Sequence, residues 1–454
     1  MNPKLFSSSS ENKHPFPHDF DWGIGISSFQ AEGGSARDLR GESIWDVFPA
    51  HKIKDLSNAN RSCNFYENYK QDLNLVKWLN IKNFKTSISW PRIFPDGHGS
   101  VNQKGLDYYD RLTDAMLHRG ITPWYVMYHW DLPQSIQNKG GWTNRDTVLY
   151  FQEYLDTCYS RLKDRVDNWI VMNEPFVFVG AGYFLGIHAP GETSLKKFLT
   201  ATHHVNLANG LGINTLQNLG AKNVGTSLSF SSLHPFKNNT SNLAALKRSN
   251  ALINHLFLDP LLGKQYPTKT LPFLKKIENH IKPNDLVDMY CTPNFIGVQV
   301  YTREIIKENW FTPYIRAKVV SAQKRGKQTT TLGQEVYPEA VAEIIQYLDS
   351  YIDIQTTPLY ITECGISLSE DSKFQPVNDE YRIQYYQKVL KSLEPFAQAG
   401  KVKGLFLWSL LDNFEWAEGY TAPFGLFNVN WDSLERNPKN SAFWFKHYLR
   451  GQFS

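Results

Sequence analysis

The sequence predicts an α/β protein that folds as a single (β/α)₈ TIM barrel with long loops on its top face. Short apolar runs alternate with longer segments of helical periodicity, this alternation yields eight expected strands, and no internal repeat or linker divides the 454 residues. Right-handed crossovers over eight units close into a barrel, and barrels with loop insertions reach this length as one domain.

The expected strands are short and are bounded by turn-forming residues. They cover residues 20–26, 83–89, 122–128, 168–172, 223–230, 295–301, 359–362 and 404–409. The expected helices cover residues 66–79, 104–118, 147–163, 199–219, 339–350 and 380–399. An open, doubly wound sheet is the alternative, but Gly23 and Gly25 supply only a fragment of a glycine-rich phosphate loop.

Long connecting segments are expected at five places along the chain. They cover residues 29–60, 129–145, 174–197, 302–335 and 410–438. Most of them follow an expected strand, so in a barrel they form the top face, where active sites lie. Residues 1–15 are polar and Ser-rich and are expected to be a disordered tail, which leaves 16–454 as the folded domain.

Charge and cysteine usage exclude several classes of protein. The 48 basic and 44 acidic residues give a net charge of +4 without a basic run, which argues against a nucleic-acid or membrane-surface partner. The four cysteines are far apart and form no CxxC pair, so neither a zinc site nor a disulfide framework is expected. The chain has no apolar leader and no apolar run of about 18 residues, so we expect a cytoplasmic protein with reduced cysteines.

Two glutamates stand at the ends of expected strands. Glu174 follows the apolar run 169–172, and Pro175 after it is expected to block continuation of a strand or helix. Glu363 follows the run 359–362. If these runs are the fourth and seventh strands, the two carboxylates face each other across the barrel mouth. Such a pair suits glycoside hydrolysis, because one group acts as the acid and the other attacks the sugar; a separation of about 5–5.5 Å gives retention. The alternative for each glutamate is an ion pair or a loop cap.

Several stretches of the chain are individually specific. They are FDWGIGISSFQAEGG, SISWPRIFPDG, YHWDLPQSIQNKGGW, WIVMNEP, GYFLGIHAPG, LYITECG and WSLLDNFEWAEGY. With these motifs the chain resembles glycoside hydrolase family 1, the β-glucosidase-type enzymes, from about Phe16 to the C-terminus. The resemblance implies a (β/α)₈ barrel, retaining hydrolysis of a small-molecule or oligosaccharide β-glycoside, and no metal or organic cofactor.

The resemblance also assigns roles to individual residues. Glu174 of the NEP motif is the implied acid/base, and Glu363 is the implied nucleophile, to which Tyr301 would donate a hydrogen bond. The implied sugar-binding residues are Gln30, His129, Asn173, Trp408, Glu415 and Trp416. Amide and carboxylate groups suit sugar hydroxyls, and the indole faces suit the C–H surfaces of a sugar. Plain packing is the alternative for His129 and Trp408.

The chain departs from the family around the implied nucleophile. Lys85 stands where the family has Arg, Gln299 stands where it has Asn, and Cys364 stands where Asn usually follows the nucleophile. Lysine offers a point charge in place of the planar fork of arginine, so we expect slower catalysis than in an Arg enzyme. Further on, Ala422-Pro423 replaces a basic residue that often precedes the Phe-Gly pair.

Two branches of the family are disfavoured. Members that act on 6-phosphorylated sugars lack the Glu415-Trp416 pair, whose carboxylate would repel a phosphate. The thioglucosidase branch has Gln at the position of Glu174. The sequence therefore predicts release of a neutral sugar, glucose first and galactose or fucose as alternatives.

Other readings remain open at the level of sequence. A catalytically weak sugar-binding or receptor-like relative is the alternative function, and its support is the altered surroundings of Glu363. Transglycosylation is not separated from hydrolysis. Trp142, Phe176, Tyr183 and Trp310 are candidates for an outer aglycone subsite, with loop packing as the alternative for each.

Overall fold

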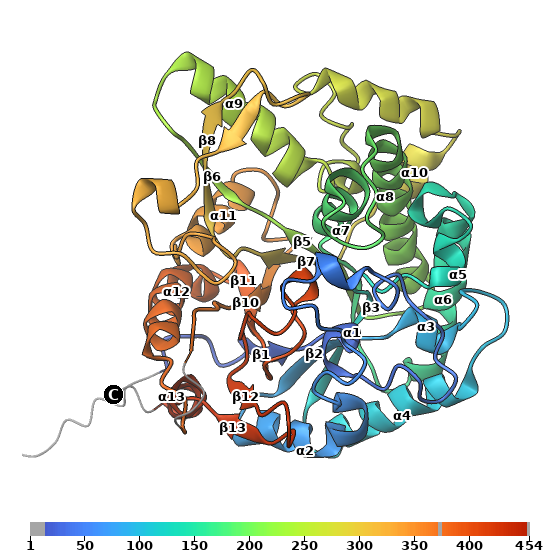
Figure 1. Cartoon of the computed structure of the whole chain (residues 1–454), viewed down its shortest axis with the longest axis vertical. Helices are drawn as coiled ribbons and strands as arrows, with labels where there is room; N and C mark the ends of the chain where they lie inside the picture. Colours follow the sequence, from blue (N-terminus) through green and yellow to red (C-terminus); the bar gives the residue numbers. More distant parts are fainter. Residues whose placement is uncertain (1–13, 371–374, 452–454) are drawn as a thin grey trace, which may run out of the picture.

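The computed structural model describes residues 14–370 and 375–451, and eight parallel strands in it close into a barrel (Figure 1). The barrel strands are β1 (Asp21–Gly25), β2 (Asn83–Ser87), β3 (Thr122–Tyr128), β4 (Asn168–Asn173), β5 (Asn223–Ser229), β7 (Phe295–Gln299), β10 (Leu359–Cys364) and β11 (Val402–Trp408). Their order around the barrel is β1-β11-β10-β7-β5-β4-β3-β2. Closure through the β1–β11 and β1–β2 pairs confirms the barrel and excludes the open sheet.

The expected strands are all present, with ends that differ by no more than two residues. All eight are short and largely buried, because in a parallel barrel one face of each strand packs on the outer helices and the other fills the interior. β4 and β10 are the fourth and seventh barrel strands in chain order, as predicted for the two glutamate-bearing runs.

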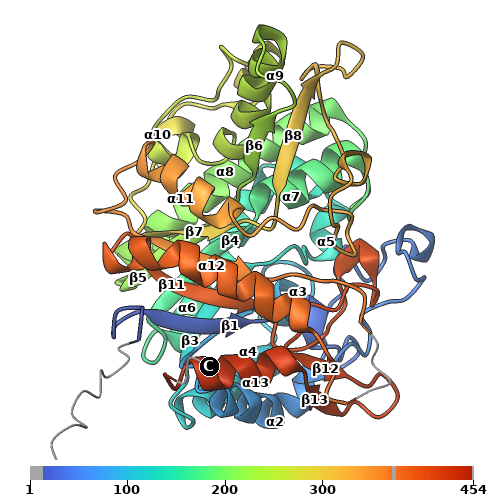
Figure 2. The same cartoon turned by 90° about the vertical axis from the view of Figure 1, so that its left-hand side faces the viewer.

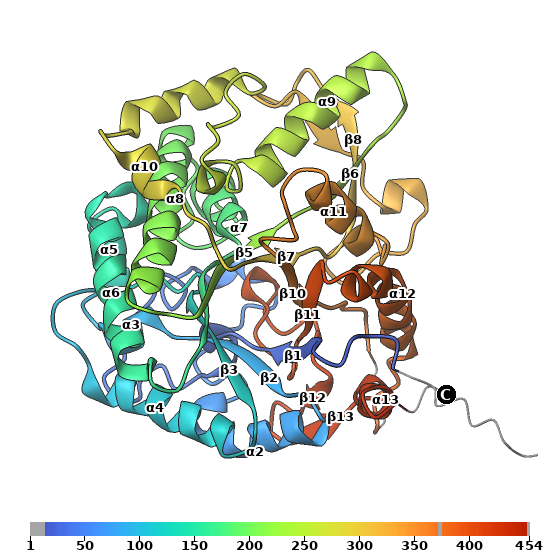
Figure 3. The same ribbon diagram turned by 180° about the vertical axis from the view of Figure 1, so that it is seen from behind.

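The outer layer consists of helices between consecutive strands (Figures 2 and 3). The six predicted helices are present as α2 (Phe65–Trp78), α4 (Gln103–Leu117), α6 (Asp146–Leu162), α8 (Leu195–Asn218), α11 (Ala340–Asp349) and α12 (Glu380–Gln398). α4 buries Tyr109, Leu112 and Met116 at spacings of three and four residues, the period of one helix face. α8 begins four residues before its expected start, because Ser194 Oγ accepts a hydrogen bond from Lys197 N at 3.3 Å and caps the helix.

Two expected loops contain strands. Segment 302–335 holds β8 (Arg303–Glu308) and β9 (Ala317–Val319), which join β6 (Ser232–Pro235) in a small sheet of order β6-β8-β9. Segment 410–438 holds the antiparallel pair β12 (Phe427–Val429) and β13 (Arg436–Pro438). The small sheet is ordered by burial of Ile306 and Ala317 against α9 (Thr240–Asn250). In Figures 1 and 2, β8 and α9 lie together at one end of the molecule, away from α13 (Asn440–Tyr448).

Aromatic side chains fill the barrel interior below the mouth. Six residues from five strands form one buried cluster: Trp124, Val126, Ile170, Phe295, Tyr360 and Phe406. A Cβ at Gly23 would lie 2.2 Å from Cδ1 of Phe406, so this position has to be glycine. Gly23 therefore makes room for the core, and the phosphate-loop reading of Gly23 and Gly25 is not supported.

The predicted tail is ordered at its last two residues. Residues 1–13 lie outside the described residues. The His14 ring packs edge-on to Trp22 and Tyr448, with ring centroids 5.8 and 5.3 Å apart, and Pro15 O accepts a hydrogen bond from Gln398. The folded part thus begins slightly before residue 16. Within the described ranges, no helix has the length and apolar character needed to cross a membrane.

Candidate active site

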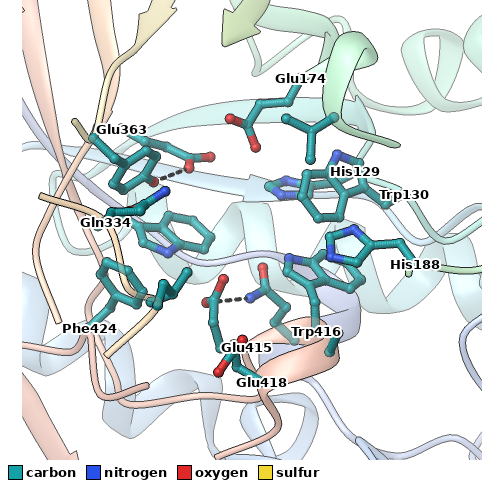
Figure 4. A pocket seen from close by; sticks show the side chains of 16 residues that line it. His129, Trp130, Glu174, His188, Gln334, Glu363, Glu415, Trp416, Glu418 and Phe424 are labelled. Carbon is teal, nitrogen blue, oxygen red and sulfur yellow. Dashed lines mark hydrogen bonds between the residues drawn. The ribbon is translucent and has the colours of Figure 1, made fainter. Parts of the chain in front are cut away.

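A pocket of about 270 Å³ opens among the loops that follow the barrel strands (Figure 4). This volume is near the lower end of the range for small-molecule sites, about 300–1,000 Å³. Its lining residues are Gln30, His129, Trp130, Glu174, Val177, His188, Tyr301, Leu332, Gln334, Glu363, Trp408, Glu415, Trp416, Ala417, Glu418 and Phe424. Each of the five predicted long segments contributes to this lining, which confirms that these segments build the active-site face.

Glu174 is placed by the turn between β4 and α7 (Pro175–Val179). Its φ of +49° lies in the left-handed region, which is uncommon for a non-glycine residue, and its N–H donates to Ser227 O at 2.8 Å. The prediction that Pro175 blocks a helix is wrong. Pro175 occupies the first position of α7, where the missing N–H of proline costs nothing. Figure 4 shows the Glu174 carboxylate turned toward the pocket.

The surroundings of Glu174 favour its neutral form. Burial raises its pKa well above 4.5, and the negative charge of Glu363 raises it further, while Lys85 acts in the opposite direction. A buried carboxyl with a like charge nearby keeps its proton at higher pH than a free one. Glu174 is therefore suited to donate a proton.

Glu363 has the opposite surroundings. Lys85 Nζ donates to its Oε1 at 2.6 Å, and the Tyr301 hydroxyl donates to its Oε2 at 2.6 Å. Burial and the nearby Glu363 raise the pKa of Tyr301 well above 10, so this residue remains a hydrogen-bond donor. A cation and a phenol on the two oxygens suit a carboxylate that works in its charged form.

Lys85 is fixed by its packing. Its side chain is fully buried in β2, its Nζ lies 5.3 Å from the Trp408 ring centre, and a Cβ at Gly25 would lie 3.2 Å from its Cε. Burial lowers the pKa of Lys85, and Glu363 opposes that change. Lys85 thus lies beside Glu363 as predicted.

The two other departures from the family contact different groups. Gln299 is next to Glu363 in the β7–β10 register, but its Nε2 donates to Asn173 Oδ1 at 2.7 Å and Ser227 Oγ at 2.8 Å, on the acid/base side. Cys364 follows Glu363 on a strand, so its side chain faces the opposite way. There it joins the main hydrophobic core, and burial raises its thiol pKa to about 12. The expectation that both residues surround the nucleophile is corrected.

Gln30 and Glu415 form one polar wall of the pocket. Gln30, in α1 (Ser28–Ala31), donates from Nε2 to Glu415 Oε2 at 3.1 Å and to Phe414 O at 3.0 Å, and its Oε1 accepts from Ser27 Oγ at 2.7 Å. Burial, with a further contribution from the charge of Glu363, raises the pKa of Glu415 to about 8. The predicted pair is therefore brought together, with both groups within reach of a bound molecule.

Trp408, Trp416 and His129 form the aromatic part of the site. The His129 ring lies 6.0 Å from each indole ring and within about 23° of parallel to both. Burial, with the charge of Lys85, lowers the pKa of His129 well below 6.5, so the ring is neutral. Asn173 is fully buried and is not among the lining residues, but its Nδ2 lies 3.2 Å from His129 Nε2.

The outer-subsite candidates do not line the pocket. Trp142 and Tyr183 are buried in the core, where Trp142 Nε1 donates to the Tyr128 hydroxyl, and Phe176 packs against the same core. Trp310 is 67% exposed on the β8–β9 connection. Loop packing was the alternative for each of these candidates, and large rings in long loops supply the packing that orders those loops.

Eight lining residues were not predicted. They are Trp130, Val177, His188, Leu332, Gln334, Ala417, Glu418 and Phe424. A signal existed for five of them: Trp130 follows His129 directly, His188 belongs to the GYFLGIHAPG stretch, Ala417 and Glu418 belong to WSLLDNFEWAEGY, and Phe424 is in the Phe-Gly pair. For Leu332 and Gln334 there was none, because they lie in an irregular segment 31 and 33 residues after Tyr301.

Comparison with known proteins agrees with this geometry. The family model "Glycosyl hydrolase family 1" matches residues 12–452. Beta-glucosidase A of Acetivibrio thermocellus is 38% identical over 453 residues, which cover 97% of this chain and 99% of the relative. Beta-glucosidase A of Thermotoga maritima is 34% identical over 449 residues, which cover 97% and 98%.

Solved structures agree with the sequences. The family 1 β-glucosidase from Thermotoga maritima superposes with a TM-score of 0.91 at 32% identity, over 96% of this chain and 98% of the other. The same enzyme in complex with glucoimidazole gives a TM-score of 0.90 at 33% identity, over 96% and 99%. With two carboxylates in unlike surroundings at the mouth of the barrel, the chain belongs to glycosyl hydrolase family 1, a family of retaining β-glycoside hydrolases.

Proposed function

We propose that this protein removes a terminal glucose from β-glucosides by double displacement, with Glu174 as acid/base and Glu363 as nucleophile. The observation that carries the proposal is the contrast between the two carboxyl groups. Glu363 accepts hydrogen bonds from Lys85 and Tyr301, whereas burial and the charge of Glu363 raise the pKa of Glu174. Two nearby carboxyls in such different surroundings supply the acid and the nucleophile of a retaining mechanism.

In the first step, a carboxylate oxygen of Glu363 attacks the anomeric carbon while Glu174 gives its proton to the departing oxygen. The bond to the aglycone breaks, and a covalent glycosyl–Glu363 ester forms. In the second step, Glu174, now charged, takes a proton from water, whose oxygen attacks the anomeric carbon and releases Glu363. The configuration at the anomeric carbon inverts in each of the two steps, so the product retains the β-configuration.

The remaining lining residues suit a neutral sugar. Gln30 and Glu415 offer an amide and a carboxyl to adjacent hydroxyls, Trp408 and Trp416 offer apolar faces, and His129 is held neutral beside Asn173. In its charged form Glu415 would repel a phosphate group. The names of the relatives, β-glucosidases, favour glucose over galactose or fucose.

The sugar-binding alternative is less well supported. A binding-only relative has no use for a buried Lys–Glu ion pair with a second carboxyl of raised pKa in the same pocket, since such groups are costly to bury. Lys85, the departure that suggested weak catalysis, nonetheless contacts the carboxylate at 2.6 Å. Transfer to an acceptor sugar in place of water uses the same intermediate and is the second outcome to measure.

We also propose that residues 16–454 form one catalytic domain. We further propose that the protein is cytoplasmic. The support is that Cys63, Cys158, Cys291 and Cys364 are all buried free thiols, which fits a reducing compartment. Fractionation of the native host, with detection by antibody, tests the location.

Azide rescue tests the two assigned roles separately. Glu363→Gly and Glu174→Gly should both lose turnover of an aryl β-glucoside. Azide should restore the Glu363→Gly variant with α-glucosyl azide as product, because azide attacks from the side of the missing nucleophile. It should restore the Glu174→Gly variant with β-glucosyl azide, because azide then replaces the water of the second step. Exchanged anomers, or no activity in the unaltered protein, would contradict the proposal.

A further inference from the structure

Gln299 links the two strands that carry the glutamates. It ends β7, and its Nε2 donates to Asn173 Oδ1 at 2.7 Å and to Ser227 Oγ at 2.8 Å. Ser227 Oγ in turn lies 2.5 Å from Thr362 Oγ1. All four side chains are buried. A hydrogen-bonded chain therefore runs from Thr362, which precedes the proposed nucleophile, to Asn173, which precedes the proposed acid/base.

Gln299 fixes which way the Asn173 amide faces. Because Oδ1 of Asn173 accepts from Gln299, its Nδ2 is directed to the other side, where it lies 3.2 Å from His129 Nε2. An amide N–H only donates, so His129 Nε2 is the acceptor and the proton of the neutral ring is on Nδ1. The amide of Gln299 thus sets both the orientation of Asn173 and the tautomer of His129.

Asn173 Nδ2 carries two N–H groups, and its bond to His129 Nε2 uses one of them, so the second is available to a ligand. His129 lines the pocket, and Asn173 is buried beside it. The oxygen of a sugar hydroxyl accepts from such an amide N–H. The role of Gln299 rests on the proposed function, and we assign to Asn173 the hydroxyl next to the anomeric carbon, a contact that strengthens in the transition state.

We propose that Gln299 is a positioning residue, which acts through Asn173 and His129 to orient the hydrogen bonds to the sugar 2-hydroxyl. A second observation supports this role. Gln299 Oε1 is buried and, within the described part of the chain, has no hydrogen-bond partner. A buried acceptor without a partner lowers stability, so stability alone does not account for a long amide at this position. The two hydrogen bonds that Gln299 Nε2 donates do account for it.

The test compares two substrates in the variant Gln299→Met, which keeps side-chain length and removes both donors. The substrates are 4-nitrophenyl β-D-glucoside and its 2-deoxy analogue. We expect kcat/KM for the glucoside to fall about 10- to 100-fold, the range for loss of one well-placed hydrogen bond in the transition state. For the 2-deoxy substrate, which lacks the hydroxyl, we expect a change of less than about twofold, because the interaction being lost is absent from the start.

Asn173→Ala should give the same selective loss, and the double variant should be little worse than Asn173→Ala alone, since the two residues act in series. Asn223→Ala is the matched control. It removes an amide–amide hydrogen bond between β5 and β4, Asn223 Nδ2 to Asn168 Oδ1 at 2.8 Å, at the opposite end of the barrel. It should leave the ratio of the two kcat/KM values unchanged.

Thermal unfolding of each variant shows whether the fold is kept. If Gln299→Met does not fold, Gln299→Glu, which keeps the shape and accepts where glutamine donates, should show the same selective loss. An equal loss on both substrates, or an unchanged kcat/KM for the glucoside in a folded variant, would overturn the positioning role. Absence of activity of the unaltered protein on both substrates would instead contradict the proposed function.

Discussion

Replacement of Lys85 by methionine removes the cation beside the proposed nucleophile with little change in volume. Lys85 Nζ lies 2.6 Å from Glu363 Oε1, and the two side chains are 0% and 4% exposed, so water cannot take the place of the ammonium group. Loss of one preorganised donor at a group that carries charge in the reaction costs about 10²- to 10³-fold in rate, so kcat/KM should fall by about that factor.

The assay measures kcat/KM for an aryl β-glucoside as a function of pH. Without the cation, Glu363 Oε1 loses its hydrogen bond and the carboxylate is held by Tyr301 alone, so the fall should be present at every pH. Lys82→Met is the control, because Lys82 is an exposed lysine directly before the same strand. A folded Lys85→Met variant with kcat/KM within about threefold of the unaltered protein at every pH would refute the reasoning.

Three further outcomes are expected. Lys85→Arg should raise kcat/KM, because a planar fork holds a carboxylate more firmly than a point charge does; a large fall would contradict the comparison with Arg enzymes. The alkaline limb of the kcat/KM profile should report Glu174 in its protonated form, lost only as pH rises through a pKa well above 4.5; if Glu174→Gln keeps this limb with an activated aryl substrate, another group is responsible. Gly23→Ala should lower the free energy of unfolding by about 1–3 kcal/mol, because its Cβ would lie 2.2 Å from the Phe406 ring. Gly180→Ala, which has open space around the added Cβ, should not lower it. Denaturant titration compares the two variants, and equal stabilities would show that the barrel interior adapts.

The barrel was predictable because its signal is local. Most of the barrel strands are largely apolar runs of five to seven residues between turn signals, and each outer helix has one apolar face. The small β6-β8-β9 sheet was not, because its strands are short and its order depends on Ile306 and Ala317 packing on α9, a contact between distant parts of the chain.

The site was predictable where a residue belongs to a recognisable motif. It was less predictable where a side chain can bond more than one neighbour. Glu174, Glu363, Lys85 and Tyr301 are together as expected. The family position of Gln299 suggested contact with the nucleophile, but a side chain one methylene longer than Asn bonds Asn173 instead. Strand register determines the position of a residue, but the packing of the surrounding side chains determines which group its amide bonds.

Covalent trapping tests the central assignment most directly. The protein is incubated with a 2-deoxy-2-fluoro-β-glucoside that has a good leaving group. The fluorine slows both steps, and the good leaving group speeds only the first, so the intermediate accumulates. Proteolysis and mass spectrometry then locate the label. We predict one fluoroglucosyl group per chain, on Glu363 in the segment 359–364. A label on another residue, or neither label nor turnover of any aryl β-glycoside, would contradict Glu363 as the nucleophile of a retaining β-glucosidase.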